Sequence, residues 1–247
     1  QLLKAAADEG LLSAEIPEAY GGLNVDMATW TALMEGVVGL DSWAVTMTGH
    51  MGIGSQPIVR YGTPAQREAY LPRMAAGEWI GAYALTEPEA GSDAFGGMRT
   101  TAALDGGDWV LTGSKRFITN AAFADVFTVF AKTGPREVSA FVVEKDDPGF
   151  KVGKEEHKMG IVGSSTCELH FDGCRIPSGR LLGNQGDGPK IAMNILNGGR
   201  LRLGTICASQ AAQIVGRMVR YANERRQFGR PIGGFGAAPD ILKSRII

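Results

Sequence analysis

The sequence predicts an α+β fold with an N-terminal helical domain, a central antiparallel β domain and the start of a C-terminal helical bundle. Apolar residues recur at helical spacing near both ends, whereas the middle consists of short alternating runs rich in Val, Ile, Thr and Phe, broken by glycines. A chain of 247 residues, 44% of them hydrophobic, is long enough to bury a large core. We expect the three domains at 1–79, 80–185 and 186–247, joined as one unit because no repeat or low-complexity linker separates them.

Helices are predicted in three stretches of the N-terminal region: LKAAADEGLL, DMATWTALMEGVVGLDSWAVTMTGHMGIG and TPAQREAYLPRMAAGE. In the third stretch, Thr63 is the expected N-cap and Pro64 the expected first helical residue, where its missing amide hydrogen costs nothing. The segments IPEAYGG and RYGTP between these stretches have the glycine and proline of loops.

Strands are predicted in the central region by TTAALDGGDWVLTGSKRFITN, DVFTVFAKT, VSAFVVEKD and STCELHFDGCRI. The stretch from Asp105 to Asp108 contains two glycines that accept positive φ, so it predicts a hairpin. Strands that follow one another without helical crossovers favour an antiparallel sheet. They disfavour a Rossmann fold, as does the lack of a GxGxxG between a strand and a helix.

A long helix is predicted from about residue 187 onwards, where small and apolar residues recur near helical spacing. Both ends of the chain are abrupt. QLLKAAADEGLL begins with a helix already in progress, and APDILKSRII begins a further helix that stops after about two turns. We therefore expect the chain to be an excerpt, truncated before the C-terminal helical domain is complete.

The charge balance favours a small-molecule partner over a nucleic acid or an anionic membrane, because the chain has 25 basic and 26 acidic residues and so no strong net positive charge. No apolar run reaches the ~18–20 residues that span a bilayer, and no signal peptide is visible, so we expect a soluble protein without a membrane span. The thiols have no CxxC pair and the histidines have no metal-ligand spacing. Structural, inert cysteines, a reducing compartment and no metal site are therefore expected. The residues concerned are Cys167, Cys174, Cys207, His50, His157 and His170.

Residues 83–93, YALTEPEAGSD, end a predicted strand in a turn. Pro88 lacks an amide hydrogen, so the sheet ladder must stop near Thr86 and the amides there become available to a ligand. Gly91 allows close approach, and the turn that starts at Ser92 favours an anion-binding concavity. The alternative is an ordinary β-turn with a local Asx hydrogen bond.

The stretch GSKRFITNA, residues 113–121, places Phe117 and Thr119 on one face of a strand and Ile118 on the other. An aromatic ring beside a hydroxyl could support a planar heterocycle. Alternating strands contain such pairs everywhere, so a purely structural pair is the alternative.

Taken together, four motifs resemble the acyl-CoA dehydrogenase family across essentially the whole chain. They are YALTEPEAGSD, LTGSKRFITNA, PGFKVGKEEHKMGIVGSSTCELHFDGCRIP and ERRQFGRPI, in that order. The resemblance implies an N-terminal helical domain, a central β domain and a C-terminal four-helix domain. It also implies an FAD cofactor.

The resemblance implies a role for each matching residue. The backbone and hydroxyl of the first motif would hold the flavin pyrimidine, its glycine and serine would contact the FAD phosphates and the pantetheine arm, and the second motif would lie beside the isoalloxazine. There the hydroxyl of Thr119 would lie near flavin N5, and Phe117 replaces a family tryptophan. The implied FAD contacts are Tyr83, Leu85, Thr86, Gly91, Ser92, Phe117, Ile118, Thr119, Arg225, Gln227 and Phe228.

The segment NGGR resembles the family's acyl-CoA channel, so Arg200 and Asn197 join Ser92 as implied substrate contacts, although relatives often carry Asp in place of this asparagine. ERRQFGRPI resembles a stretch that reaches the FAD of a neighbouring subunit, with Arg225 as the implied phosphate ligand. A solvated helix face is the alternative for Arg225 and the better interpretation of Arg217 and Arg220. Relatives usually have a glutamine where this chain has Gly236, which puts part of the intersubunit contact in question.

The implied activity is α,β-dehydrogenation of an acyl-CoA, with electrons passed to an electron-transfer flavoprotein and with a homotetrameric assembly. An oxygen-using acyl-CoA oxidase and a non-catalytic paralogue that binds acyl-CoA or FAD are the alternatives. The compartment would be the cytoplasm, or the mitochondrial matrix in a eukaryote.

No catalytic residue is assigned within the chain, because the general base of most relatives lies beyond the point that matches Ile247. A minority of relatives place a glutamate before the arginine of NGGR, where this chain has Gly199. Glu87 and Glu89 are interpreted as turn and surface residues, not as the base.

Overall fold

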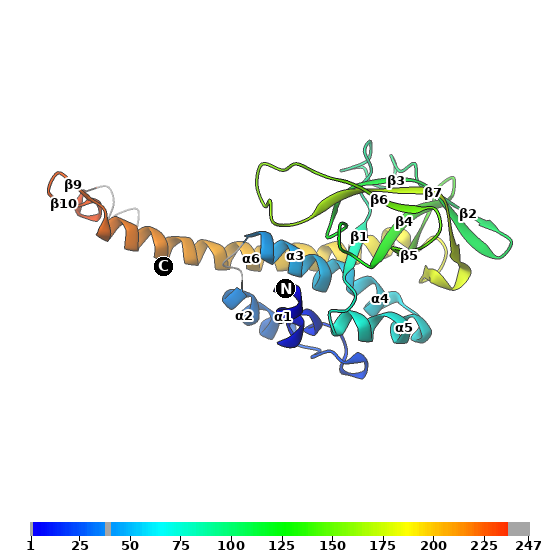
Figure 1. Cartoon of the computed structure of the whole chain (residues 1–247), viewed down its shortest axis with the longest axis horizontal. Helices are drawn as coiled ribbons and strands as arrows, with labels where there is room; N and C mark the ends of the chain where they lie inside the picture. The colour runs from blue at the N-terminus through cyan, green and yellow to red at the C-terminus, as the bar shows by residue number, and fades with distance from the viewer. Residues whose placement is uncertain (1, 38–40, 237–247) are drawn as a thin grey trace.

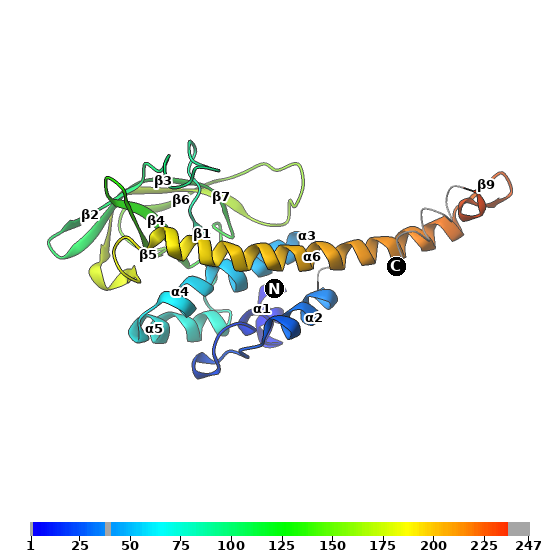
Figure 2. The ribbon, with the colours of Figure 1, turned by 180° about the vertical axis from the view of Figure 1, so that it is seen from behind.

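The computed structural model describes residues 2–37 and 41–236, with only the backbone described at Val37 and Asp41. Short helices come first, an eight-stranded sheet follows, and one long helix runs between the two layers (Figures 1 and 2). This order confirms the predicted α+β fold. The division at residues 79/80 and 185/186 stays a prediction.

Within the described residues, the helical layer is built from five α-helices and one π-helical segment, with two 3₁₀ turns at Leu11–Ser13 and Glu18–Tyr20. The helices are α1 Leu2–Asp8, α2 Met27–Val37, α3 Asp41–Thr48, η3 Gly49–Gly54 (the π-helix), α4 Gln56–Tyr61 and α5 Pro64–Ala75. The predicted cap of α5 is confirmed, because Thr63 Oγ accepts from the Gln66 amide at 3.2 Å and the Gln66 side chain accepts from the Thr63 amide at 2.8 Å.

The helix predicted over residues 26–54 is divided in the structure. Residues 38–40 lie outside the described part of the chain, and the last turn is the wider π-helix η3. Three of the six residues of η3 are glycines, which have low α-helical propensity. Two of them, Gly49 and Gly52, allow the end of β3 and α6 to approach this segment closely, because an added Cβ would lie 3.2 Å from Thr119 Cγ2 or from Arg202 Cδ.

The sheet has the order β6-β7-β3-β2-β4-β5-β8, with β1 paired to β4. Its strands are β1 Gly81–Ala84, β2 Thr101–Asp105, β3 Asp108–Thr119, β4 Val126–Gly134, β5 Glu137–Glu144, β6 Phe150–Glu155, β7 Thr166–Pro177 and β8 Leu181–Leu182. The pairs are antiparallel except that β1 and β2 run parallel to β4, which sequence alternation did not predict. The predicted hairpin joins β2 to β3, where Gly106 and Gly107 both have positive φ.

The core lies on both faces of the sheet, and β4 shows how. Phe127 and Val129 pack inside the sheet with aromatic residues of β3, β6 and β7, whereas Val126 and Phe130 face α5 and α6. A third cluster packs α2, α3 and η3 against one another through buried residues such as Trp30. Ile206 joins α6 to the same cluster. The sheet is thereby fixed to the helical layer and to α6.

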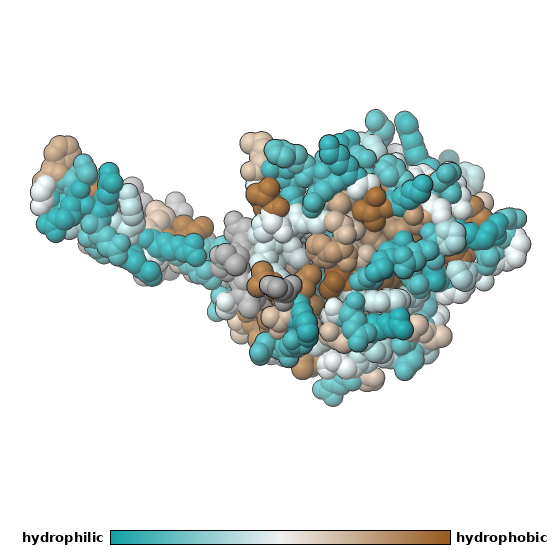
Figure 3. Space-filling view, viewed as in Figure 1, coloured by the Kyte–Doolittle hydropathy of each residue, from teal (hydrophilic) through white to brown (hydrophobic). Residues whose placement is uncertain are grey.

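Helix α6 spans Gly188–Glu224, which confirms the predicted long helix. Its first half packs in the body and its second half projects away, ending in the hairpin of β9 (Arg226–Gln227) and β10 (Arg230–Pro231) (Figures 1 and 2). On the face in Figure 3, hydrophobic surface gathers between the sheet and the helical layer, while the projecting end is mostly hydrophilic. Within the described ranges, no helix is long and apolar enough to cross a membrane. The helix predicted over APDILKSRII lies outside the described residues.

Candidate functional site

Two adjoining pockets lie where the ends of β1 and β3 meet η3 and α6. The strand pocket, of about 440 Å³, is lined by the loop after β1, the end of β3 and one face of α6. It contains most residues singled out in the sequence: Tyr83, Leu85, Thr86, Gly91, Ser92, Phe117, Ile118, Thr119 and Arg200. These residues are up to 117 positions apart along the chain, so the fold collects them into one place.

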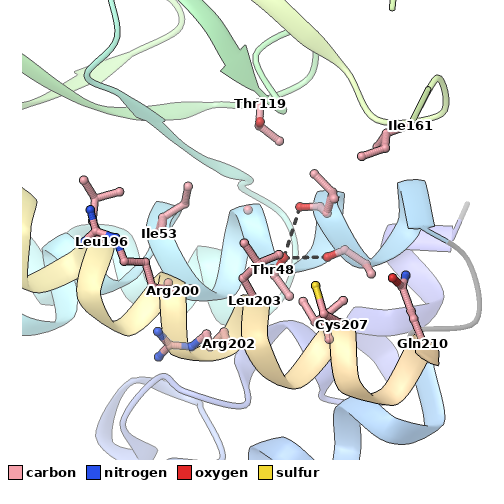
Figure 4. A pocket seen from close by; sticks show the side chains of 16 residues that line it. Thr48, Ile53, Thr119, Ile161, Leu196, Arg200, Arg202, Leu203, Cys207 and Gln210 are labelled. Carbon is pink, nitrogen blue, oxygen red and sulfur yellow. Dashed lines mark hydrogen bonds between the residues drawn. The ribbon is translucent and has the colours of Figure 1, made fainter. Parts of the chain in front are cut away.

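The helix pocket, of about 540 Å³, is mainly apolar and lies between α3, η3 and α6 (Figure 4). Thr119 and Ile161 reach its opening from the sheet side, and Leu203 and Cys207 line it from α6. The hydroxyl of Thr48 donates to the Ala44 carbonyl at 2.7 Å, so its hydrogen is already engaged in the helix. Both pockets share Ile53, Thr119, Leu196 and Arg200, so a ligand in one can continue into the other.

The loop after β1 is fastened by Glu87. The peptide groups of Glu87 and Ala90 exchange two hydrogen bonds of 3.1 Å around Pro88, which makes the predicted tight turn. The Glu87 side chain is only 4% exposed and accepts from the amides of Arg99 at 2.6 Å and Thr100 at 3.1 Å. The interpretation of Glu87 as a surface residue is therefore wrong, whereas Glu89 is exposed as expected.

Lys115 of β3 is the partner of this carboxylate. Its side chain is completely buried, and its Nζ donates to Glu87 Oε1 at 2.8 Å and to the Leu85 carbonyl at 3.2 Å. Burial lowers the pKa of Lys115 to about 8, against the opposing effect of Glu87. Burial raises the pKa of Glu87, but the Lys115 charge and the hydrogen bonds that it accepts outweigh this and hold it below its ordinary value.

The end of β3 departs from regular alternation. Its pairing with β7 shifts register between Lys115 and Ile118, and Phe117 has a left-handed φ of 59°. Ile118 is buried in the sheet core, whereas Phe117 is 56% exposed and lines the strand pocket. The predicted opposite orientation of Ile118 is present, and the bulge supplies the turn of the backbone that places Thr119 at both pockets.

Two features of the strand pocket fit a ligand that brings polar atoms close to the backbone. Tyr83 Oη is buried and has no hydrogen-bond partner within the described part of the chain. A Cβ added to Gly91 would meet no atom within 4 Å, so packing inside the chain does not require this glycine. Both residues line the strand pocket.

Four of the sequence-predicted residues lie outside both pockets. Asn197 accepts a hydrogen bond of 2.6 Å from Arg200 Nη1 and so contacts the strand pocket only through that side chain. Arg225, Gln227 and Phe228 lie at the far end of α6 and in the β9–β10 hairpin, with exposed side chains. Arg217 and Arg220 are exposed on α6, as a solvated helix face requires.

The cysteines differ from one another. Cys167 and Cys174 are buried, and burial raises the pKa of Cys174 to about 12, in line with inert structural thiols. Cys207 is exposed and lines the helix pocket, so it is not packed in the core as a structural thiol would be, and its inertness stays a prediction. The described residues contain no group of His, Cys, Asp and Glu that could hold a metal ion.

Sequence reasoning missed several residues that line the pockets, among them Ile53, Met193 and Leu196. Apolar residues on helices look alike in a sequence, so no signal separated them from core residues. The burial of Lys115 could have been predicted, because in β3 it lies at alternate positions with Trp109 and Leu111, whose side chains face the core.

The fold and the two pockets define a class of α+β protein in which a pocket at the ends of two strands continues into a mainly apolar pocket between helices. Comparison with known proteins gives the family. Profiles described as the acyl-CoA dehydrogenase N-terminal, middle and C-terminal domains match residues 1–78, 82–174 and 186–240. The chain belongs to the acyl-CoA dehydrogenase family.

Individual relatives agree. A probable acyl-CoA dehydrogenase of Bacillus subtilis is 50% identical over 98% of this chain and 41% of its own length. The human very long-chain specific acyl-CoA dehydrogenase is 39% identical over 96% of this chain and 38% of its own. The crystal structure of an acyl-CoA dehydrogenase complexed with FAD from Bacillus anthracis superposes with a TM-score of 0.95 at 45% identity, covering 98% of this chain and 42% of that one. The chain thus spans about two fifths of the length of these relatives.

Proposed function

We propose that the protein containing this chain is an FAD-dependent acyl-CoA dehydrogenase that converts an acyl-CoA to the trans-2-enoyl-CoA and passes electrons to an electron-transfer flavoprotein. The observation that carries the proposal is the gathering of most of the predicted flavin residues in one pocket of mixed polarity that adjoins a mainly apolar one. The relative from Bacillus anthracis, which was solved with FAD, supports the cofactor.

The residues of the strand pocket fit the flavin part of FAD. Leu85 and Thr86 would contact its pyrimidine end, and Phe117 to Thr119 would lie beside its rings. The unpartnered Tyr83 Oη would gain a hydrogen bond, and the open space at Gly91 would admit a group close to the backbone. FAD, when bound, supplies the acceptor for the hydride that leaves the β-carbon.

The substrate would lie across both pockets. Ser92 and Arg200, at the strand pocket, would contact the pantetheine arm, and the apolar lining of the helix pocket would take the acyl chain. Asn197 would act through Arg200, because its side-chain oxygen accepts from that guanidinium. Burial of the acyl chain excludes water from the carbons that react.

The general base would come from residues after Ile247. Glu87 is committed to Lys115 and two amides, and Gly199 offers no side chain where a minority of relatives have a glutamate. Asp93 is the one acid among the described residues that line either pocket, and it accepts from the Gly96 amide at 3.1 Å. Its exposed carboxylate is held by its own loop.

Assembly as a homotetramer would give a role to the far end of α6. Arg225, Gln227 and Phe228 lie outside the pockets of their own chain, which suits contact with the FAD of a neighbouring subunit. The proposed compartment is the cytoplasm, or the mitochondrial matrix in a eukaryote.

The test uses the full-length protein that contains this chain, reconstituted with FAD. We expect flavin absorption after gel filtration, and bleaching of that absorption without oxygen when an acyl-CoA is added, with free CoA as the control. A protein that stays colourless after reconstitution would exclude the cofactor. Flavin that no acyl-CoA bleaches would point to the non-catalytic paralogue, and fast reoxidation by oxygen instead of electron-transfer flavoprotein would point to an oxidase.

A further inference from the structure

We propose that Lys115 is a positioning residue that aims the Thr86 amide hydrogen into the strand pocket, with Glu87 as its counter-charge. The inference rests on the proposed function, because the group that the amide meets there would be the flavin. No motif assigned a role to Lys115 at the sequence level, and neither pocket includes it among its lining residues.

The peptide group between Leu85 and Thr86 fixes the direction of the Thr86 amide. The Leu85 carbonyl and the Thr86 amide belong to one trans peptide, so the oxygen and the amide hydrogen point in opposite directions. Lys115 Nζ holds that oxygen at 3.2 Å from the buried side of the loop. The amide hydrogen of Thr86 is therefore directed away from Lys115, and it has no acceptor within the described part of the chain.

The next peptide, between Thr86 and Glu87, is oriented in the same way. The Arg116 amide donates to the Thr86 carbonyl at 2.8 Å, which directs the Glu87 amide the other way, and that amide reaches the Ala90 carbonyl at 3.1 Å. Consecutive residues of β3 thus fix two consecutive peptides after β1. The first leaves its amide for a ligand, and the second uses its amide to close the turn before Gly91 and Ser92.

Glu87 extends the effect to the other end of the loop. Besides Lys115, its carboxylate accepts from the amides of Arg99 and Thr100, which lie just after the loop that contains Gly91 and Ser92. One ion pair therefore holds the peptide of Leu85 and both ends of this loop. The pyrimidine contacts and the phosphate contacts of the proposed cofactor would share one support.

A purely structural role explains this pair poorly. A buried ion pair often stabilises a fold no better than an apolar pair of similar volume, because both charges must lose their water. An apolar pair could fill the space but could neither donate to the Leu85 carbonyl nor accept from two amides. A charged donor on the carbonyl also polarises the peptide and strengthens the Thr86 amide as a donor.

The test compares the full-length protein with three variants: Lys115→Met, the double variant Lys115→Met with Glu87→Met, and Glu87→Gln. Thermal unfolding of the FAD-free protein measures stability, and titration with FAD, followed by flavin fluorescence and visible absorption, measures the site. We expect Lys115→Met to be the least stable, because it leaves a buried carboxylate unpaired. The double variant should recover most of the stability but bind FAD about tenfold or more weakly, with altered flavin absorption.

Glu87→Gln leaves the Lys115 bond to the Leu85 carbonyl possible and keeps one acceptor oxygen, but the amides of Arg99 and Thr100 donate to different oxygens of Glu87, so one of them loses its acceptor. It should therefore keep more FAD affinity than the double variant at equal or lower stability. Arg180→Met is the matched control, since it breaks a shielded pair with Asp147 outside both pockets, and it should lower stability alone. A double variant with wild-type FAD affinity and absorption would overturn the inference, as would affinity that follows stability across all variants. A wild-type protein that binds no FAD would instead remove the proposed function, and this inference with it.

Discussion

Individual buried polar side chains hold neighbouring segments together. His50, which lies outside both pockets, is an example. The Gly81 amide donates to His50 Nδ1 at 3.0 Å, and Nε2 lies 3.2 Å from the Met74 carbonyl, so the neutral ring with hydrogen on Nε2 satisfies both. The side chain thereby ties η3 to α5 and β1. Burial lowers the pKa of His50 to about 4, against the smaller opposing effects of the Met74 carbonyl and Asp125.

This histidine predicts a pH dependence of stability. The native pKa is below that of the unfolded chain, so the stabilisation is complete above about pH 6.5 and is lost as the pH falls towards 4. The loss should approach about 3 kcal/mol, at about 1.4 kcal/mol per pH unit. Urea unfolding at several pH values should show a smaller loss for His50→Gln than for the wild type over this interval. Equal slopes would mean that His50 does not remain neutral in the native state.

At the level of secondary-structure elements, the crossing of η3 and β1 depends on two glycines. An added Cβ at Gly54 would lie 2.6 Å from the Gly81 carbonyl oxygen, and one at Gly81 would lie 2.7 Å from Met74 Cε and 2.9 Å from the Gly54 carbonyl carbon. Backbones at this distance leave no room for a side chain. This contact places the end of β1, and with it the loop of the strand pocket, against the helical layer.

Gly54→Ala should therefore destabilise the protein by about 1–3 kcal/mol, because the backbones must separate. Gly36→Ala is the matched control, since Gly36 is an exposed residue of α2 and an added Cβ would meet nothing within 4 Å. There alanine should stabilise by about 0.5–1 kcal/mol through helix propensity. Chemical denaturation of both variants measures the change in the free energy of unfolding. A gain in stability for both variants would show that the close contact is unimportant.

Across the whole molecule, α6 is the element that joins the two pockets. It lines the strand pocket at Met193 and the far end of the helix pocket at Gln210, and the pockets meet at Leu196 and Arg200. From Leu196 to Gln210 the helix rises about 21 Å. A straight acyl chain that starts at the strand pocket could thus follow α6 for several turns, past Leu203 and Cys207 (Figure 4).

Cys207→Phe should shorten the range of acyl chains that the protein accepts. In the wild type, each added methylene should improve acyl-CoA affinity about fourfold, from about 0.8 kcal/mol per buried methylene, until the tail passes Cys207. The phenylalanine should leave short chains unaffected and abolish the gain for long ones, whereas Cys207→Ser, of similar volume, should follow the wild type. Calorimetric titration with a series of acyl-CoAs measures this, and parallel length profiles for all three proteins would contradict it.

Much of the fold followed from local patterns. The capping box at Thr63, the hairpin at Gly106 and Gly107 and the long helix α6 depend on neighbouring residues, so a linear sequence contains their cause. The residues of the strand pocket came from motifs that resemble a known family. Their gathering in one pocket agrees with that expectation, while their individual roles stay predictions.

What the linear pattern could not contain was decided by contacts between distant segments. Glu87 looks like a surface acid in a turn until Lys115, 28 residues later, and two amides of the returning loop enclose it. Cys207 looks like a packed thiol until η3 and α6 are placed with a pocket between them. Local preferences act over a few residues and so can be read from the sequence, whereas burial and the partner of a charge depend on which segments meet, and only the tertiary structure settles that.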